Sequence, residues 1–221
     1  MNKSITHTEL TIKLKDISLR GILSIPKNAE GIVIFSHGSG SSRLSTRNNF
    51  VARTLNNEGL ATLLFDLLTF EEDMIYANRF DIDLLTSRLV QTTQWVQQQE
   101  KTPTLSIGYF GSSTGAASAL LAAGILGNQI HAVVSRGGRT DLAIPDIRNV
   151  IVPTLFIVGE LDKAVISLNK EAYEYLTKTR EFVIIPGASH LFEEAGTLEQ
   201  VSEVATKWFK KWLSPTLVKN V

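Results

Sequence analysis

Residues 111–115, Gly-Ser-Ser-Thr-Gly, decide how the rest of this sequence is interpreted. A β-like run at 104–110 precedes them, and the small residues at 116–126 predict a helix. A serine flanked by glycines two positions away, between a strand and a helix, is typical of a sharp turn that lifts a nucleophile above a sheet. The glycines leave room for the strand and helix to cross closely. The pattern therefore predicts Ser113 as a nucleophile and acyl transfer to water as its reaction.

An acid and a histidine follow two later predicted strands. The strand ending near 158 leads into a turn with Glu160 and Asp162, and the strand ending near 185 leads into a loop with His190. Functional residues of open α/β sheets collect past the carboxyl ends of strands, so this order predicts a triad of Ser113, Asp162 and His190. His190 would take the serine proton, and Asp162 would orient the imidazole. Glu160 is the competing acid, but its reach from the strand end is poorer.

Backbone N–H groups that would bind the developing oxyanion are predicted at two places. One is Thr114, the residue after the nucleophile. The other lies in the loop at 37–40, His-Gly-Ser-Gly, where small residues let the backbone approach a ligand. We assign Ser39 first and Gly40 second within that loop. Loss of one such donor typically costs about 3 kcal/mol in the transition state.

Hydrophobic patterning predicts an α/β fold that begins with two antiparallel edge strands, at 9–15 and 17–25. Later strands are apolar on both faces, as buried parallel strands are, and alternate with helices. The predicted later strands are 31–36, 60–65, 104–110, 130–135, 152–158 and 181–185, and the helices are 48–57, 81–99, 116–126, 168–176 and 197–213. Residues 67–80 are predicted to be irregular. The result is a mostly parallel twisted sheet with helices on both faces, in one domain spanning 1–221 with a flexible tail at 214–221.

The composition excludes several classes of function. The 221 residues carry 22 basic and 22 acidic side chains, so no basic field is available for nucleic acid. The absence of cysteine excludes disulfides and zinc–thiolate sites and fits a reducing cytoplasm. Neither the first residues nor any later run resembles a signal peptide or a membrane span. We expect a cytoplasmic protein that uses no membrane, metal or cofactor.

Each candidate residue also has a purely structural interpretation. Ser113 could occupy an ordinary glycine–serine turn, Asp162 could cap the next helix, and His190 could be a loop histidine without a partner. The coincidence of three suitable residues at three strand ends favours the catalytic interpretation. For His37 the structural interpretation is favoured, because a histidine before a glycine loop more often braces the backbone than transfers protons.

Two arginines follow the strand at 130–135. Arg136 and Arg139 could bind an anionic group of a substrate, or their guanidiniums could pair with Asp141 or Asp146. The pairing is favoured. Arg43 has the same two interpretations.

The motifs together make the chain resemble the α/β-hydrolase superfamily and, within it, the dienelactone-hydrolase-like group. The resemblance spans residues 10–213 and is carried by the segments 37–43, 111–115, 135–139, 158–162 and 187–192. Dienelactone hydrolase itself uses a cysteine nucleophile where this chain has Ser113, so the resemblance implies serine esterase chemistry. Members often insert a cap before the acid strand. Only 137–151 is available for one here, which predicts a minimal cap and an open site.

The sequence therefore predicts a serine hydrolase that cleaves small carboxylic esters, or thioesters or lactones, through an acyl-enzyme on Ser113. Short, soluble esters are the expected substrates, with 67–80 and 142–147 forming the rims of the site. Two alternatives stay open: a catalytically inactive binding module with this fold, and an acyltransferase or peptidase that uses the same triad. The sequence does not fix the oligomeric state.

Overall fold

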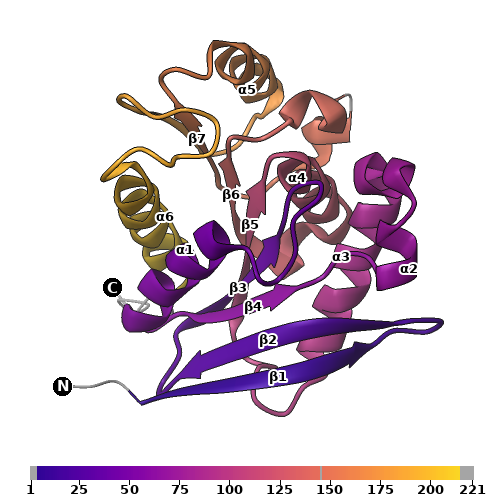
Figure 1. Ribbon diagram of the computed structural model, residues 1–221. Helices are drawn as coiled ribbons and strands as arrows, with labels where there is room; N and C mark the ends of the chain where they lie inside the picture. The colour runs from indigo at the N-terminus through magenta and orange to yellow at the C-terminus, as the bar shows by residue number, and fades with distance from the viewer. Residues whose placement is uncertain (1–3, 145, 215–221) are drawn as a thin grey trace.

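A single eight-stranded sheet organises the structure, a computed structural model that describes residues 4–144 and 146–214 (Figure 1). The strands follow one another across the sheet in the order β1-β2-β4-β3-β5-β6-β7-β8. Their bounds are β1 Ile5–Lys13, β2 Ser18–Pro26, β3 Gly31–Ser36, β4 Ala61–Phe65, β5 Ser106–Ser112, β6 Ile130–Arg136, β7 Thr154–Gly159 and β8 Arg180–Ile185. Of the tail predicted to be flexible, only Ser214 lies inside the described residues.

The antiparallel start of the chain is confirmed. Strand β1 pairs antiparallel with β2, and β2 pairs antiparallel with β4. The turn between the first two strands closes where Leu14 N–H donates to the carbonyl of Ile17. From β4 onward all neighbouring strands are parallel. Because parallel strands share one direction, the carboxyl ends of β3, β5, β6, β7 and β8 meet along the same edge of the sheet.

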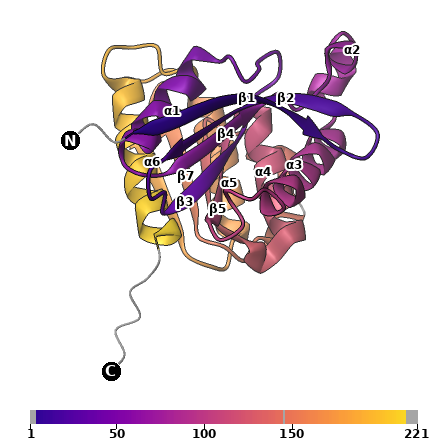
Figure 2. The same ribbon diagram turned by 90° about the horizontal axis from the view of Figure 1, so that it is seen from below.

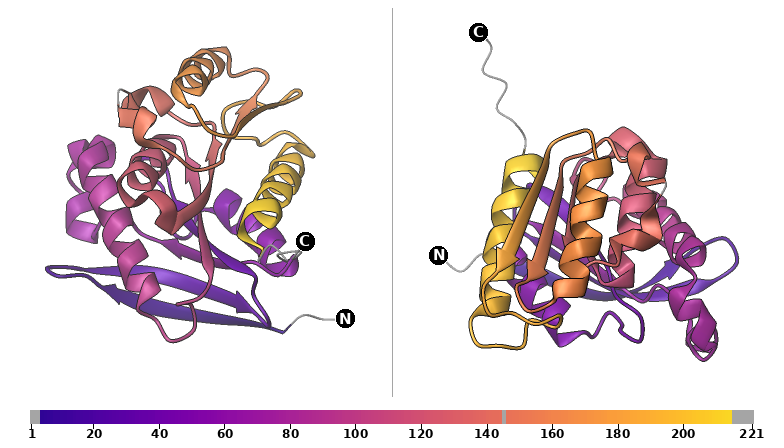
Figure 3. Two further views of the ribbon diagram at one scale, coloured as in Figure 1. Left: turned by 180° about the vertical axis from the view of Figure 1, so that it is seen from behind. Right: turned by 90° about the horizontal axis from the view of Figure 1, so that it is seen from above.

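Helices cover both faces of the sheet, as the sequence predicts (Figures 2 and 3). One face carries α1 and α6, whose buried residues share a core with β3, β5 and β7. The other face carries α3, α4 and α5 over a second core. The helix bounds are α1 Thr46–Asn57, α2 Phe70–Asp73, α3 Ile82–Gln97, α4 Thr114–Leu126, α5 Lys163–Tyr175 and α6 Thr197–Leu213. Short 3-10 turns are η1 Tyr76–Phe80, η2 Gly127–Gln129, η3 Thr140–Ala143 and η4 Asp146–Asn149.

Three predicted elements differ from the structure by more than two residues. The strand expected at 9–15 begins four residues earlier, because β1 pairs with β2 from Ile5 onward. The helix expected at 168–176 begins five residues earlier, because α5 starts directly after Asp162 and packs Val165 and Ile166 against the sheet. The segment 67–80 is also not irregular, since it holds α2 and η1. A capping box starts α2: Thr69 accepts from Glu72 N–H, and the Glu72 carboxylate accepts from Thr69 N–H.

The cap is minimal, as expected. Only η3, η4 and their connections lie between the end of β6 and the start of β7. Nothing in this stretch is long enough to form a lid over the carboxyl edge of the sheet. Within the part of the chain that the structure describes, no helix is both long and apolar enough to cross a membrane.

Candidate active site

Ser113 lies in the turn between β5 and α4 with φ 51° and ψ −122°. A positive φ is unusual for a residue with a side chain and costs about 1–3 kcal/mol unless its surroundings impose it. The flanking glycines show how closely the backbone crosses here. A Cβ on Gly115 would lie 2.2 Å from the carbonyl oxygen of Ser36, and one on Gly111 would lie 2.5 Å from the Cα of Ala116. The turn therefore has the strained, crowded geometry that the pentapeptide predicts.

The loop after β6 fixes the backbone of this turn. Ser113 N–H donates to the carbonyl of Arg136 at 3.2 Å, and Arg139 N–H donates to the carbonyl of Ser113 at 3.0 Å. These two hydrogen bonds, one with the last residue of β6 and one with the loop after it, hold the strained conformation of Ser113.

Asp162 and His190 come together at the ends of β7 and β8. His190 Nδ1 lies 2.6 Å from Asp162 Oδ2, and the aspartate side chain is only 13% exposed. A carboxylate can only accept, so Nδ1 is the donor, which leaves Nε2 as the acceptor nitrogen of the imidazole. Asp162 precedes α5 without capping it through its side chain, so its carboxylate is not used as a helix cap.

Glu160, the competing acid, has a different partner. Its Oε2 accepts from Gly187 N–H at 2.8 Å, and Leu161 N–H donates to the carbonyl of Ala188 at 2.9 Å. These bonds join the turn after β7 to the loop that carries His190. Glu160 therefore helps to position the histidine loop while Asp162 contacts the imidazole.

Ser113 and His190 line the same pocket, of about 260 Å³, which we call the nucleophile pocket. No hydrogen bond joins the Ser113 hydroxyl to the imidazole within the described residues. Catalytic hydrogen bonds are often long without substrate and tighten when it binds. A larger hollow of about 730 Å³ contains neither residue, although it shares Ser41 with the nucleophile pocket. Among residues 4–144 and 146–214, no group of three or more His, Cys, Asp or Glu side chains could hold a metal ion.

The predicted oxyanion donors lie close together, but one of them already has a partner. Ser39 N–H donates to the side-chain hydroxyl of Thr114 at 2.9 Å. Ser39 lines the nucleophile pocket. Gly40 does not line it among the described residues. Of the two residues expected in this loop, only Ser39 therefore borders the pocket, and its N–H has the Thr114 hydroxyl as acceptor.

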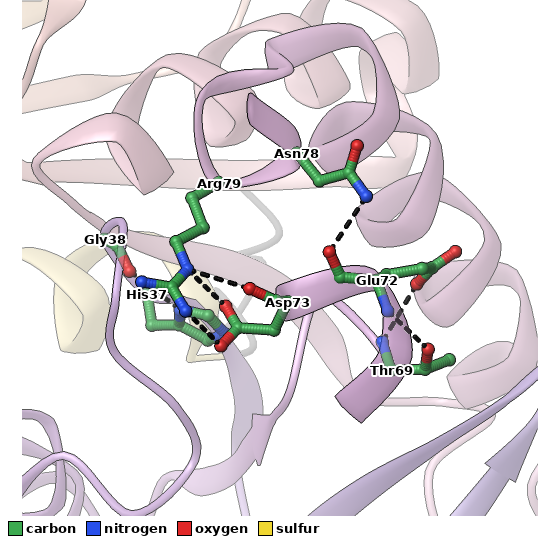
Figure 4. A network of polar contacts seen from close by, with 7 residues as sticks. All are labelled: His37, Gly38, Thr69, Glu72, Asp73, Asn78 and Arg79. Atoms are coloured by element: carbon green, nitrogen blue, oxygen red, sulfur yellow. Dashed lines mark hydrogen bonds and ion pairs between the residues drawn. The ribbon is translucent and has the colours of Figure 1, made fainter. Parts of the chain in front are cut away.

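His37 braces backbone on both sides of its ring, as interpreted from the sequence. Figure 4 shows the contact with Gly38. Its Nδ1–H donates to the carbonyl of Gly38 at 2.9 Å, and its Nε2 accepts from Leu67 N–H at 3.0 Å. Burial lowers the pKa of His37 and outweighs the Gly38 hydrogen bond and the two nearby aspartates, Asp66 and Asp73, which raise it. A neutral His37 ties the glycine loop to the start of 67–80.

The arginines differ from one another. Arg139 forms a two-point ion pair with Asp141, at 2.9 and 2.8 Å, and Arg43 pairs with Asp66 at 2.6 Å. The pairing predicted for Arg136 is wrong, because no acid forms an ion pair with it anywhere in the described chain. Asp141 is already paired with Arg139, whereas the Arg136 side chain packs against Phe192 and lines the nucleophile pocket.

Sequence reasoning missed the contribution of α1 to this pocket. Arg47 and Asn48, in the first turn of α1, both line it. Ser112 Oγ donates to Asn48 Oδ1 at 3.1 Å, which links the turn between β5 and α4 to α1. The only signal was the helix start itself, where Ser45 accepts from Asn48 N–H. A linear pattern does not show that the residues of this start face a strand end 64 positions away.

Among solved structures, the chain is similar to dienelactone hydrolase from Anabaena variabilis, with 49% identity and a TM-score of 0.92 over 95% of this chain and 99% of that one. It shares its fold with Est1E from Butyrivibrio proteoclasticus, at 19% identity and a TM-score of 0.77, over 92% of this chain and 98% of that one.

Two Mycobacterium tuberculosis proteins with the provisional name of phosphoribosyl transferases are 50% identical over 201 residues. The match covers 91% of this chain but only 45% of theirs, so the chain spans less than half the length of these relatives. The dienelactone hydrolase family model matches residues 19–215. The fold, the placement of the site and these likenesses agree, and the chain belongs to the dienelactone hydrolase family.

Proposed function

We propose that this chain is a serine hydrolase that cleaves small carboxylic esters, or thioesters or lactones, through an acyl-enzyme on Ser113. One observation carries the proposal: the 2.6 Å pair of His190 and Asp162 borders the same pocket as a serine held at positive φ. Strained backbone that persists in a well-packed structure is concentrated at functional sites. A nucleophile, a base and an orienting acid are the parts that acyl transfer needs.

The reaction then follows from the placement of these groups. The Ser113 hydroxyl attacks the ester carbonyl while His190 Nε2 takes its proton, and Asp162 stabilises the imidazolium that forms. The alcohol leaves with the proton that His190 returns. Water, deprotonated by the same nitrogen, attacks the acyl-enzyme and releases the acid and the free serine.

The backbone N–H groups of Thr114 and Ser39 are the proposed oxyanion donors. In the absence of substrate, the Ser39 N–H donates to the Thr114 hydroxyl. The oxyanion must therefore replace this hydroxyl as the acceptor. Exchanging a neutral acceptor for a charged one favours the transition state, because hydrogen bonds to ions are roughly twice as strong. These hydrogen bonds raise the rate because they are stronger to the oxyanion of the transition state than to the neutral carbonyl of the bound ester.

A preference for small, soluble esters is supported by the size of the nucleophile pocket and by the minimal cap. The pocket holds about 260 Å³, which is below the usual range for sites that enclose drug-sized ligands. Residues 68–71 line the adjoining larger hollow, in line with a rim at 67–80. The described residues of 142–147 line neither, so a second rim there is the weaker part of the proposal. Est1E has been solved with ferulic acid bound, which shows that this fold accommodates a small aromatic acid in that protein.

The phosphoribosyl transferase name of the longer relatives is not carried over to this chain. The matched region is less than half of those proteins, and it coincides with the part that the dienelactone hydrolase family model covers. The features that support a function here belong to acyl transfer: a serine turn, a histidine–aspartate pair and adjacent backbone donors.

Turnover of p-nitrophenyl butyrate tests the proposal. We expect Ser113→Ala to lower kcat by on the order of 10⁶-fold, because the nucleophile of a triad is lost. Ser87→Ala, which changes an exposed serine outside both the nucleophile pocket and the larger hollow, is the control and should keep wild-type activity. A wild-type protein that hydrolyses no activated ester would support the inactive binding module. Faster transfer to an added alcohol than to water would favour an acyltransferase.

A further inference from the structure

Arg136 is a buried cation beside the proposed nucleophile, and within residues 4–144 and 146–214 it has no counter-ion. It is the last residue of β6, is 7% exposed and lines the nucleophile pocket. Its guanidinium carbon lies 5.5 Å from the centre of the Phe192 ring, and Phe192 is itself held at φ 55°. Its Nε is buried and has no hydrogen-bond partner in the described structure. Burying an unpaired charge is expensive, so such a group is expected where a ligand completes it.

A second guanidinium, that of Arg47 in the first turn of α1, lines the same pocket. Among the described residues, its Nε is also buried and without a hydrogen-bond partner. Its Nη1 pairs with Glu193 at 2.8 Å, but that glutamate side chain is 63% exposed, so the pair holds Arg47 only weakly. Burial and then the positive charge of Arg47 lower the pKa of Arg136 to about 10. The two guanidiniums therefore border one pocket, from the end of β6 and the start of α1.

The rest of the lining supplies donors and no acid. Among the described residues, the pocket is bordered by Ser39, Ser41, Ser45, Asn48 and Ser112, besides glycine, leucine and the groups already named. Two of these hydroxyls already have partners: Ser45 accepts from Asn48 N–H, and Ser112 donates to Asn48 Oδ1. A pocket with two guanidiniums, further hydroxyls and no carboxylate in its lining is complementary to an anion rich in oxygen.

We propose that the nucleophile pocket binds a phosphate group carried by the ester substrate, held between Arg136 and Arg47 beside Ser113. The proposal rests on the proposed hydrolase function and names its substrate class. A phosphate monoester carries a charge of about −1.5 to −2 and three acceptor oxygens, so it can offset both cations. A carboxylate, with one charge, would match only one of them. The bond that breaks is the carboxylic ester, to which water is added, and the phosphate ester stays intact.

Three butyrate esters of matched size test this assignment: those of 4-hydroxyphenyl phosphate, 4-hydroxybenzoate and 4-hydroxybenzamide. Wild-type kcat/KM should be highest for the phosphate ester. In Arg136→Gln we expect a loss on the order of 100-fold for that ester, because a buried charge-assisted contact is lost, and less than about threefold for the neutral amide. Arg139→Gln, which changes an arginine of the same loop outside the pocket, is the matched control.

A binding measurement separates this proposal from the proposed hydrolysis. Phenyl phosphate should bind wild-type protein by calorimetry and inhibit turnover of the neutral ester, and Arg136→Gln should abolish both effects. Turnover of the neutral ester without any phosphate preference would overturn the phosphate site and leave the hydrolase standing. Equal preference for the carboxylate ester would overturn the choice of phosphate. Binding of phenyl phosphate that depends on Arg136, in a protein that hydrolyses no ester, would keep the site and overturn the hydrolase.

Discussion

Two regions at the carboxyl edge of the sheet are built in different ways. The turns after β5, β7 and β8, which carry Ser113, Asp162 and His190, are joined to neighbouring strands by backbone hydrogen bonds. The segment 67–80 is held by side chains instead. Arg79 pairs with Asp73 at 2.9 Å, beside His37 (Figure 4), and Arg88 pairs with Glu72 at 2.5 Å.

The outer residues of this segment are also more exposed, although Leu67 and Leu68 at its start are buried. Phe70 is 78% exposed and Tyr76 is 70% exposed, whereas the side chain of Asp162 is 13% exposed. Backbone bonding to a buried sheet leaves little freedom in where the proposed catalytic groups lie. The Arg79–Asp73 pair lies nearer to solvent than the Arg88–Glu72 pair and contributes little. Backbone hydrogen bonds therefore fix the proposed catalytic groups, whereas side chains hold the outer part of 67–80.

The largest test of this comparison is Asp162→Asn, with Glu160→Gln as its control. We expect kcat to fall on the order of 10⁴-fold in Asp162→Asn, because the amide favours the wrong imidazole tautomer. Glu160→Gln keeps an acceptor for Gly187 N–H and should change kcat by less than about tenfold. Steady-state kinetics on a short ester decides the matter. An equal loss in the two variants would mean that the contact of Asp162 with the imidazole has no special role.

The next test concerns the crowded turn. Gly115→Ala places a methyl group 2.2 Å from the Ser36 carbonyl oxygen, which is backbone and cannot move aside. We expect a loss of at least about 3 kcal/mol in the free energy of unfolding, measured by urea denaturation. Gly196→Ala is a control at a glycine with open space but positive φ, where only local strain of about 1 kcal/mol is expected. Similar losses in the two would show that crowding at the turn is not what demands glycine.

A smaller effect is expected from the histidine that joins the two regions. Burial lowers the pKa of His37 in the folded protein, so the unfolded chain binds the proton more readily. His37 should therefore make stability fall as the pH drops below about 6.5, by at most about 1.4 kcal/mol per pH unit. Urea unfolding at pH 8 and pH 5.5 should show a weaker pH dependence in His37→Gln than in the wild type. An unchanged slope in His37→Gln would contradict the account.

The smallest effect is expected at the rim. Tyr76→Ser exposes no core and should change the free energy of unfolding by less than about 0.5 kcal/mol. Turnover of a short ester should also be unchanged, since Tyr76 does not line the nucleophile pocket among the described residues. A large loss of short-ester activity would show that the rim takes part in the chemistry and would remove the contrast between the two regions.

The sequence predicted the parts of the molecule in which local patterns determine structure. The serine turn, the central strands and the histidine loop have glycine spacing and apolar runs that indicate them directly. The pocket wall formed by Arg47 and Leu191 could not be predicted, because it depends on how α1 and the loop after β8 meet in space. The predicted pairing of Arg136 was wrong because nearness in sequence does not decide which arginine an acid contacts. Asp141 pairs with Arg139 instead.

Labelling with a fluorophosphonate, followed by mass spectrometry of the intact protein and its peptides, tests the central claim most directly. The account predicts one adduct, on the peptide that contains Ser113, with much slower labelling when Asp162 is replaced by asparagine. A wild-type protein that stays unlabelled, or an adduct on another residue, would contradict it.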